Sequence, residues 1–139
     1  MAFAGQGFEM IIIHHNPDCG TSRNTLEMIR ASGVEPMIIE YLKIGWTKAY
    51  LQTLFTAAGL TPKTALRVSG TPAEKLGLTL PDVSDDEIFN AMIAHPILVN
   101  RPIVVSPKGT KLCRPSEVVM DLLDTPVLGF KKEDGTRVL

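Results

Sequence analysis

The chain has 139 residues, of which 45% are hydrophobic and 21% charged, with a formal net charge of −1 at pH 7. This predicts one soluble globular domain with a sizeable core. The balanced charge argues against a general nucleic-acid-binding surface, and no apolar stretch reaches the length of a transmembrane helix or a secretory signal. Two cysteines, Cys19 and Cys113, are too few for a disulfide scaffold and favour a reducing cytoplasm.

The first elements form a strand, a helix and a second strand. The apolar, β-branched residues 10–13 predict a buried strand, and apolar positions after residue 24 predict a helix that Gly33 ends. Residues 37–39 predict a second buried strand. Two short apolar strands joined by a helix indicate a parallel βαβ unit.

A mostly helical segment follows, over about residues 47–95. Thr47 is placed to cap a helix that Gly59 closes. Residues 71–77 begin with one capping box and end on a glycine, and residues 84–95 begin with a second capping box. Each box predicts a further helix. The positions expected to face the core are Tyr50, Leu51, Leu54, Phe55, Ala58, Ile88, Phe89, Met92 and Ile93.

Residues 103–105 and 111–113 predict two more strands, joined by a hairpin loop at residues 106–110. Pro115 is placed to open a last helix. Its apolar positions are Val118, Val119, Leu122 and Leu123. The order is therefore βαβ, a helical insertion, then ββα. This is an α/β fold of thioredoxin-like arrangement, with a four-stranded mixed sheet.

The domain organisation is simple. Residues 1–9 are interpreted as an N-terminal extension or cloning remnant, and residues 10–124 as the single domain. Residues 125–139 form a polar C-terminal tail that we expect to lie loosely over the body. Within the tail, an Asp-Gly pair at residues 134–135 predicts a turn, and the charged residues 131–134 are expected to be a solvated surface.

Cys19 is the central chemical feature, because it lies in the turn between the first strand and the first helix. Free backbone N–H groups and the helix dipole favour an anion there, which lowers the pKa of a thiol. The polar residues around it oppose the alternative of a small buried hydrophobe. Ser22 stands where a Cys-x-x-Cys motif has its second cysteine, and Cys113 is expected to be a core thiol. Cys19 is therefore predicted to act alone, so turnover through a disulfide needs an external thiol, glutathione or a glutaredoxin.

Other chemistries are poorly supported. A Cys-x5-Arg phosphatase loop is excluded because Thr25 follows Cys19 by six residues and Arg23 comes too early. The three histidines and two cysteines show no repeated ligand spacing, so no metal site is expected. No glycine-rich phosphate-binding motif lies beside a strand, and no tightly bound cofactor is expected.

Residues 15–30 closely resemble the active-site loop of the glutaredoxin-dependent arsenate reductases, the ArsC family. The resemblance resumes at residues 95–105 and 112–117 and covers roughly residues 11–124. It implies the thioredoxin-like fold and an enzyme that converts arsenate to arsenite. The family chemistry implies a covalent Cys19 thiol–arsenate adduct, with glutathione as co-substrate and glutaredoxin as the protein reductant, in arsenic detoxification.

The resemblance also assigns a substrate site. It places the three oxyanion-binding arginines at Arg67, Arg101 and Arg114, and it implies a cis Pro102 that lies against Cys19. Planar guanidinium groups bind two oxygens of a tetrahedral anion at once, and their charge favours a thiolate. The sequence around Arg67 matches the family poorly.

Smaller roles are expected for the neighbours of the thiol. Ser22 is predicted to help hold its pKa down, and His15 to tune its charge or move protons, with a purely structural histidine as the open alternative. Arg23 and Asn24 are expected to contact the anion or to fix the loop. His14 stands where an aromatic residue is expected on the strand.

Two other functions stay open. A thiol reductase of the same fold would act on glutathione conjugates or other oxidised thiols, but the retained arginines oppose it. An Spx-type regulator would bind RNA polymerase, but such regulators generally carry Cys-x-x-Cys, which residues 19–22 lack. We expect a cytoplasmic monomer that binds arsenate, glutathione and glutaredoxin, and neither nucleic acid nor membrane.

Overall fold

The computed structural model describes residues 10–138, and its centre is a four-stranded mixed sheet. The strands are β1 (Ile12–His14), β2 (Met37–Ile39), β3 (Ile103–Ser106) and β4 (Gly109–Leu112), in the order β2-β1-β3-β4. β1 runs parallel to β2 and antiparallel to β3, and β3 runs antiparallel to β4. The predicted sheet is confirmed, with strand ends shifted by one or two residues.

The register of the sheet positions the site. His14 lies opposite Ile39 on one side and Ile103 on the other, and Ile103 lies opposite Leu112. The segments that leave β1, β2 and β4 therefore meet the segment that enters β3 at one edge of the sheet. These are the segments that carry Cys19 and two of the three predicted arginines.

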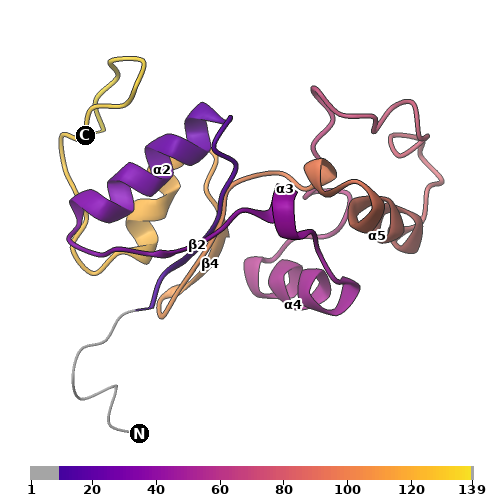
Figure 1. Cartoon of the computed structure of the whole chain (residues 1–139), viewed down its shortest axis with the longest axis horizontal. Coiled ribbons are helices and arrows are strands. Elements are labelled where there is room, and N and C mark those ends of the chain that lie inside the picture. Colours follow the sequence, from indigo (N-terminus) through magenta and orange to yellow (C-terminus); the bar gives the residue numbers. More distant parts are fainter. Residues whose placement is uncertain (1–9, 139) are drawn as a thin grey trace, which may run out of the picture.

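One layer against the sheet consists of α2 (Gly20–Ala31) and the 3-10 helix η2 (Ser116–Leu122), which lie side by side (Figure 1). The helix predicted after Pro115 thus forms as a 3-10 helix. Val118 and Val119 are β-branched, and such residues disfavour the α-helix. The buried side chains of this layer are Ile11, Ile13, Leu26, Met28, Ile29, Val104, Cys113, Val119, Leu122, Leu123 and Val138.

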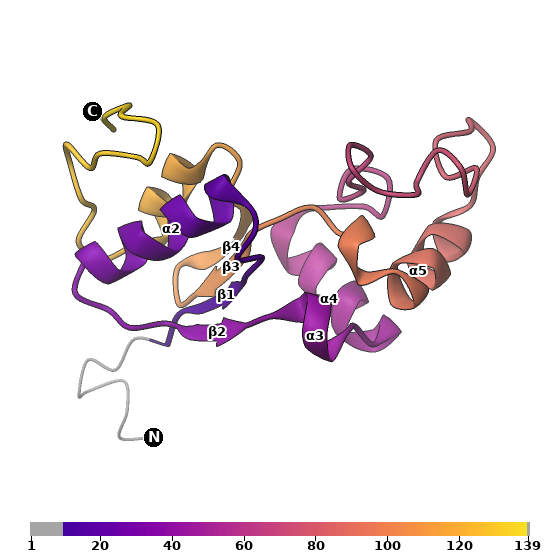
Figure 2. The same ribbon diagram turned by 45° about the horizontal axis from the view of Figure 1, so that its top comes forward.

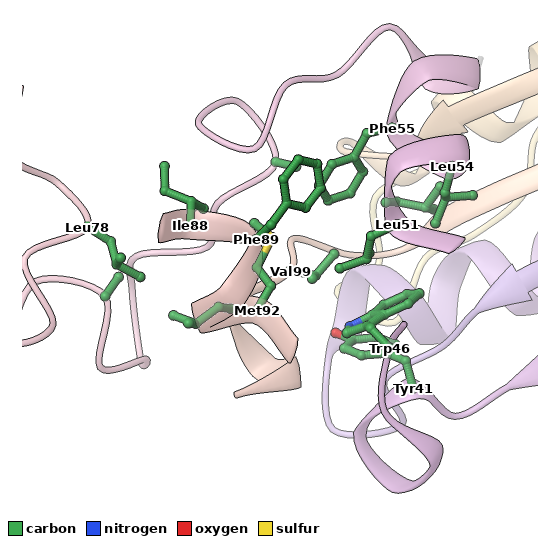
Figure 3. Close-up of a cluster of buried hydrophobic side chains, with 14 of the residues drawn as sticks. Tyr41, Trp46, Leu51, Leu54, Phe55, Leu78, Ile88, Phe89, Met92 and Val99 are labelled. Carbon is green, nitrogen blue, oxygen red and sulfur yellow. The ribbon is translucent and has the colours of Figure 1, made fainter. Parts of the chain in front are cut away.

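The insertion lies on the opposite side of the sheet from this layer (Figure 2). It contains α3 (Tyr41–Ile44), α4 (Lys48–Ala58), α5 (Asp85–Ala94) and the 3-10 helix η1 (Pro96–Leu98). Its own buried cluster, part of which Figure 3 shows, includes Tyr41, Trp46, Leu51, Leu54, Phe55, Ala65, Ala73, Leu78, Ile88, Phe89, Met92, Leu98 and Val99. No helix within residues 10–138 has the length and apolarity needed to cross a membrane.

Two of the three helices predicted in the insertion form as expected. The Thr47 side chain accepts a hydrogen bond from the N–H of Tyr50, and Gly59 ends α4 in the left-handed region at φ 69°. Ser84 and Glu87 make both bonds of the capping box that begins α5. Such caps satisfy backbone groups that a helix terminus leaves without partners.

The helix predicted over residues 71–77 does not form, and this segment makes turns only. Leu76 N donates to Pro72 O at 2.9 Å, but Gly77 already lies at φ 76°. One turn between a proline and a glycine is too short to propagate as a helix, because the first turn fixes several residues for one hydrogen bond.

Burial also differs from expectation in places. β2 was predicted to be buried, but Met37 and Ile38 are 50% and 37% exposed because β2 is an edge strand within the described residues. Tyr50 and Ile93, expected to face the core, are 41% and 37% exposed. Periodicity identifies the apolar face of each helix, but not how far the neighbouring elements cover it.

The C-terminal tail is fixed to the body rather than loose. Arg23 pairs with Glu133, and Lys132 pairs with Glu117 at 2.6 Å. The Lys132 side chain is only 14% exposed, so the expectation of a solvated charged cluster is wrong for this residue. The predicted turn at Gly135 is confirmed by its N–H bond to Lys132 O. The predicted extension over residues 1–9 lies outside the described residues.

Candidate active site

Cys19 is the N-cap residue of α2, at the edge of the sheet where β1 ends. Its backbone is extended, at φ −103° and ψ 121°, and its N–H donates to Asn16 O at 3.1 Å. Asn16 Oδ1 in turn accepts from Asp18 N at 2.9 Å. These bonds within the turn fix the sulfur over the open end of the helix.

The surroundings of Cys19 favour the thiolate. Burial alone would raise its pKa, but the backbone N–H of Ser22, the charge of Arg101, the Arg114 side chain and the N–H of Thr21 outweigh it. The pKa of Cys19 is therefore lowered from its ordinary value. A lowered thiol pKa at a helix N-terminus is the property that reactive cysteines share. The structure places Cys19 at the helix N-terminus, and its catalytic role stays a prediction.

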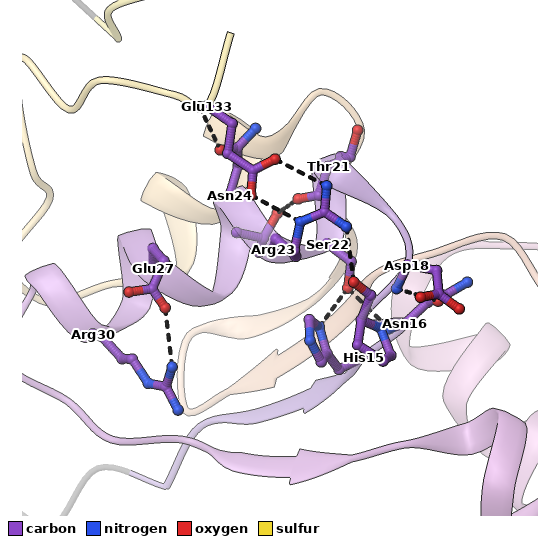
Figure 4. Close-up of polar contacts among 12 residues, drawn as sticks. His15, Asn16, Asp18, Thr21, Ser22, Arg23, Asn24, Glu27, Arg30 and Glu133 are labelled. Carbon is purple, nitrogen blue, oxygen red and sulfur yellow. Dashed lines mark hydrogen bonds and ion pairs between the residues drawn. The ribbon is translucent and has the colours of Figure 1, made fainter. Parts of the chain in front are cut away.

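Ser22 and His15 form a pair beneath the loop (Figure 4). His15 Nδ1 lies 2.7 Å from Ser22 Oγ, which also accepts from Asn16 N at 3.1 Å. The Ser22 hydroxyl is therefore engaged with the loop, and the group of Ser22 that favours the thiolate is its backbone N–H. Burial lowers the pKa of His15, so its ring is neutral at neutral pH.

Two of the predicted arginines reach the thiol from β3 and β4. Arg114 Nη1 lies 3.7 Å from Cys19 Sγ and donates to Arg101 O at 3.1 Å. Arg101 Nη1 donates to Asn100 Oδ1 at 3.3 Å, while its Nε is buried without a hydrogen-bond partner. The peptide bond between Arg101 and Pro102 is cis, as the resemblance implies.

Arg67 comes from the insertion. Its N–H donates to Leu98 O at 2.8 Å, and its Nε donates to Ser69 O at 2.9 Å. Burial and the charge of Arg101 lower the pKa of Arg67, which indicates that the two guanidinium groups share one region. Like charges that lie close together are stabilised by a bound anion.

Tyr41, which the sequence analysis did not single out, belongs to the same region. Its hydroxyl is buried, and within residues 10–138 it and Arg101 Nε are the buried side-chain polar atoms without a partner. Burial raises the pKa of Tyr41 to about 12, so its hydroxyl stays protonated. Its position directly after β2, at the edge where β1 also ends, was the signal that could have found it.

Arg23 and Asn24 lie in the first half of α2, and their side chains contact Glu133 of the tail (Figure 4). Arg23 donates to both carboxylate oxygens of Glu133, at 2.8 and 3.0 Å. Asn24 Oδ1 accepts from the backbone N–H of Glu133 at 3.0 Å. In this arrangement, both side chains contact the tail, and Arg23 also donates to Pro17 O of the loop at 2.8 Å.

His14 and Cys113 are core residues. His14 Nδ1 donates to Ile103 O at 2.7 Å, its Nε2 lies 2.6 Å from Tyr50 Oη, and burial lowers its pKa. Burial raises the pKa of Cys113 to about 12, in agreement with the expected structural role. Within residues 10–138 no group of three or more His, Cys, Asp or Glu side chains is placed to hold a metal ion.

The fold and the site together define a thioredoxin-like protein with one activated thiol, whose sulfur lies close to arginine side chains. A sequence model described as "ArsC family" matches residues 14–122. The match covers most of the chain, and the chain belongs to the ArsC family.

Individual relatives agree with this assignment. The chain is 58% identical to "Arsenate reductase ArsI2" of Synechocystis sp. (strain ATCC 27184 / PCC 6803 / Kazusa), over 94% of each chain. It is 52% identical to "Arsenate reductase" of Escherichia coli (strain K12), over 93% of this chain and 92% of the relative. The solved structure of an arsenate reductase from Vibrio cholerae superposes with a TM-score of 0.77 at 35% identity, covering 82% of this chain and 98% of that one.

Proposed function

We propose that this protein is an arsenate reductase that converts arsenate to arsenite through a covalent Cys19 thiol–arsenate adduct. The observation that carries the proposal is the Cys19 sulfur at a helix N-terminus, 3.7 Å from Arg114 Nη1, with the buried Nε of Arg101 unpartnered nearby. Relatives named arsenate reductases, 52–58% identical over most of the chain, support the same activity.

Arsenate binds first, at the arginines. A tetrahedral oxyanion accepts paired hydrogen bonds from the planar groups of Arg101 and Arg114, and from Arg67 once its side chain turns from Ser69 O. The Tyr41 hydroxyl is a neutral donor for a further oxygen. Binding satisfies donors that the free protein leaves without partners, and this favours the complex.

The Cys19 thiolate then attacks arsenic. A sulfur–arsenic bond forms, one arsenic–oxygen bond breaks, and its electron pair leaves with the oxygen as hydroxide or, after protonation, as water. Arsenic stays in oxidation state V at this step. The backbone N–H groups and arginines that stabilise the thiolate also lie where charge on the arsenate oxygens must be stabilised.

Reduction needs an external thiol. The glutathione thiolate attacks the Cys19 sulfur, a sulfur–sulfur bond forms, and the sulfur–arsenic bond breaks with its electron pair going to arsenic. Arsenic(V) becomes arsenic(III) and leaves as arsenite, while the two sulfurs are oxidised to a Cys19–glutathione disulfide. No tightly bound cofactor takes part in this sequence.

A glutaredoxin thiolate completes the cycle by attacking the glutathione sulfur of that disulfide, which releases Cys19 as thiolate. Cys113 is unsuited to this step, because it is fully buried and its pKa is raised to about 12. We propose that the enzyme works as a cytoplasmic monomer in arsenic detoxification.

The test is arsenite production from arsenate, first with glutathione alone and then with glutathione and glutaredoxin. Activity that requires glutaredoxin and disappears in Cys19→Ser is the expected result. A protein that takes up glutathione at Cys19 but forms no arsenite would instead be a general thiol reductase of this fold.

A further inference from the structure

Arg23 and Asn24 bind a short piece of peptide, contributed by the chain's own tail (Figure 4). Arg23 Nε and Nη2 donate to the two carboxylate oxygens of Glu133 at 2.8 and 3.0 Å. Asn24 Oδ1 accepts the backbone N–H of the same residue at 3.0 Å. The two side chains therefore bind the side-chain carboxylate and the backbone N–H of one glutamate, which are separated by the Cα, Cβ and Cγ atoms.

This peptide-binding pair lies next to the thiol. Arg23 follows Cys19 by one helical turn, with its N–H on Cys19 O at 2.9 Å. Its Nη1 donates to Pro17 O at 2.8 Å, which turns the guanidinium back over the loop that precedes the thiol. A methyl group added at Gly20 would lie 3.6 Å from both Arg23 Nη2 and Glu133 Oε1. The bound carboxylate thus lies over the residue adjacent to Cys19.

The contact with the tail is exchangeable. The side chains of Arg23 and Glu133 are 43% and 49% exposed. An exposed pair of this kind changes an equilibrium constant by about fivefold at most. The tail also has a separate attachment in the pair of Lys132 with Glu117. Glu133 can therefore leave Arg23 while the tail stays attached.

We propose that Arg23 and Asn24 are the binding site for a carboxylate and the adjoining N–H of glutathione, and that Glu133 occupies this site in the free enzyme. The inference rests on the proposed function, in which the glutathione thiol must reach the Cys19 sulfur. Glutathione is a tripeptide with two carboxylates and two peptide N–H groups. The Glu133 carboxylate and N–H are three carbons apart, and the γ-glutamyl carboxylate of glutathione and its cysteine N–H are four carbons apart, so these two groups of glutathione correspond to the two that Glu133 presents.

The proposal makes Glu133 a competitor of glutathione for Arg23. This role can be distinguished experimentally from that of a purely structural ion pair. Glu133→Gln and Arg23→Gln both break the same contact. A structural contact would make both variants change the enzyme in the same direction. A shared binding site makes them change the KM for glutathione in opposite directions, because one variant removes the competitor and the other removes the site.

The first experiment measures the KM for glutathione at saturating arsenate and glutaredoxin. We expect Glu133→Gln to lower it about two- to fivefold and Arg23→Gln to raise it by a similar factor, because each substitution removes one exposed charge contact. The matched control is Glu35→Gln, which breaks the paired bonds of Arg30 with Glu35 near the other end of α2, at 3.0 and 3.1 Å. It should leave the KM for glutathione unchanged.

The second experiment measures binding without turnover. S-methylglutathione, which has no free thiol, is titrated into Cys19→Ser by NMR, alone and with each second substitution. We expect the same opposite changes in Kd. Changes of equal sign in the two variants, or an unchanged Kd in Arg23→Gln, would overturn the proposal.

A reductant without a carboxylate tests whether the effect of Glu133→Gln depends on the carboxylate of glutathione or on its thiol. Dithiothreitol has no carboxylate, so the rate of arsenite release with dithiothreitol should be the same in Glu133→Gln and the unsubstituted enzyme. If Glu133→Gln changes the rate equally with dithiothreitol and with glutathione, the proposal is wrong.

If the unsubstituted enzyme forms no arsenite at all, the proposed function fails. The titration of Cys19→Ser still decides whether the site exists.

Discussion

The start of α2 and the end of β4 each carry a cysteine, and the two environments give the two thiols opposite chemistry. Cys19 is 7% exposed and Cys113 is fully buried. Burial raises the pKa of both thiols, yet only that of Cys113 ends high, at about 12. Around Cys19, two backbone N–H groups and two arginines reverse the effect. The lowered pKa of Cys19 therefore depends on oriented donors around the sulfur, which Cys113 lacks in its more deeply buried position.

The largest effect is expected from removing the reactive thiol. Cys19→Ser should lower arsenate reduction by about a thousandfold or more, because a serine hydroxyl at neutral pH is a far weaker nucleophile than a thiolate. Serine is a favourable N-cap residue, so the fold should persist. Arsenite formation and the circular dichroism melting curve measure the two effects. Substantial turnover by a folded Cys19→Ser would contradict the mechanism.

Removing Arg114, one of the donors near the Cys19 sulfur, tests how much such donors contribute to activity. Arg114→Ala should lower kcat/KM for arsenate about 100-fold, within the range for loss of one group that stabilises charge during the reaction. Arg114→Lys keeps the charge but loses the planar pair of donors, and should recover only part of the activity. Steady-state kinetics measure both variants. Full activity in Arg114→Lys would show that charge alone suffices.

The pH dependence of Cys19 alkylation tests directly whether the pKa of this thiol is lowered. Because the pKa of Cys19 is lowered, its reaction with iodoacetamide should reach half of its maximal rate at a pH below the ordinary thiol range. Removing positive charge in Arg114→Ala disfavours the thiolate, so this midpoint should move to higher pH and the rate at pH 7 should fall several-fold.

The measurement is best made in Cys113→Ala, where Cys19 is the single thiol. An unshifted midpoint in Arg114→Ala would remove Arg114 from the causes of the lowered pKa of Cys19. Arg137→Ala is a suitable control, because Arg137 donates to Gly129 O in the tail.

The smallest effect on activity is expected at the core thiol. Cys113→Ala should keep near-normal arsenate reduction and lose about 1–2 kcal/mol of unfolding free energy, because it removes one buried sulfur from a packed cluster. Denaturant unfolding measures the loss. A folded Cys113→Ala that no longer turns over with glutathione would give Cys113 a redox role.

Local chemistry predicts much of this fold. The caps at Thr47 and Ser84 and the left-handed Gly59 specify α4 and α5 through backbone bonds within a few residues. Cys19 is also identified locally, because a strand, a turn and a helix follow one another in the sequence. These features depend only on residues that are close in the chain, so they can be predicted from the sequence alone.

Features that depend on distant segments were harder to predict. The position of Tyr41 directly after β2 places it at the edge of the site, but the burial of its hydroxyl depends on segments of the insertion that are distant in the sequence. Glu133 and Arg23 are 110 residues apart, so their contact has no local signal. The roles expected for Arg23 and Asn24 at the anion, and for the Ser22 hydroxyl at the thiol, stay predictions. Their side chains have other partners in the free protein.

The arginines of the proposed site come from two separately packed parts of the molecule, so a substrate bound as proposed would connect these two parts. Arg67 belongs to the insertion, whereas Arg114 follows β4. An oxyanion that bridges them holds the two hydrophobic clusters together without any covalent bond. At a free concentration one hundred times its Kd, such a ligand adds about 2.7 kcal/mol to the free energy of unfolding. Arsenate, and the phosphate and sulfate that resemble it, are thus expected to raise the free energy of unfolding of this enzyme.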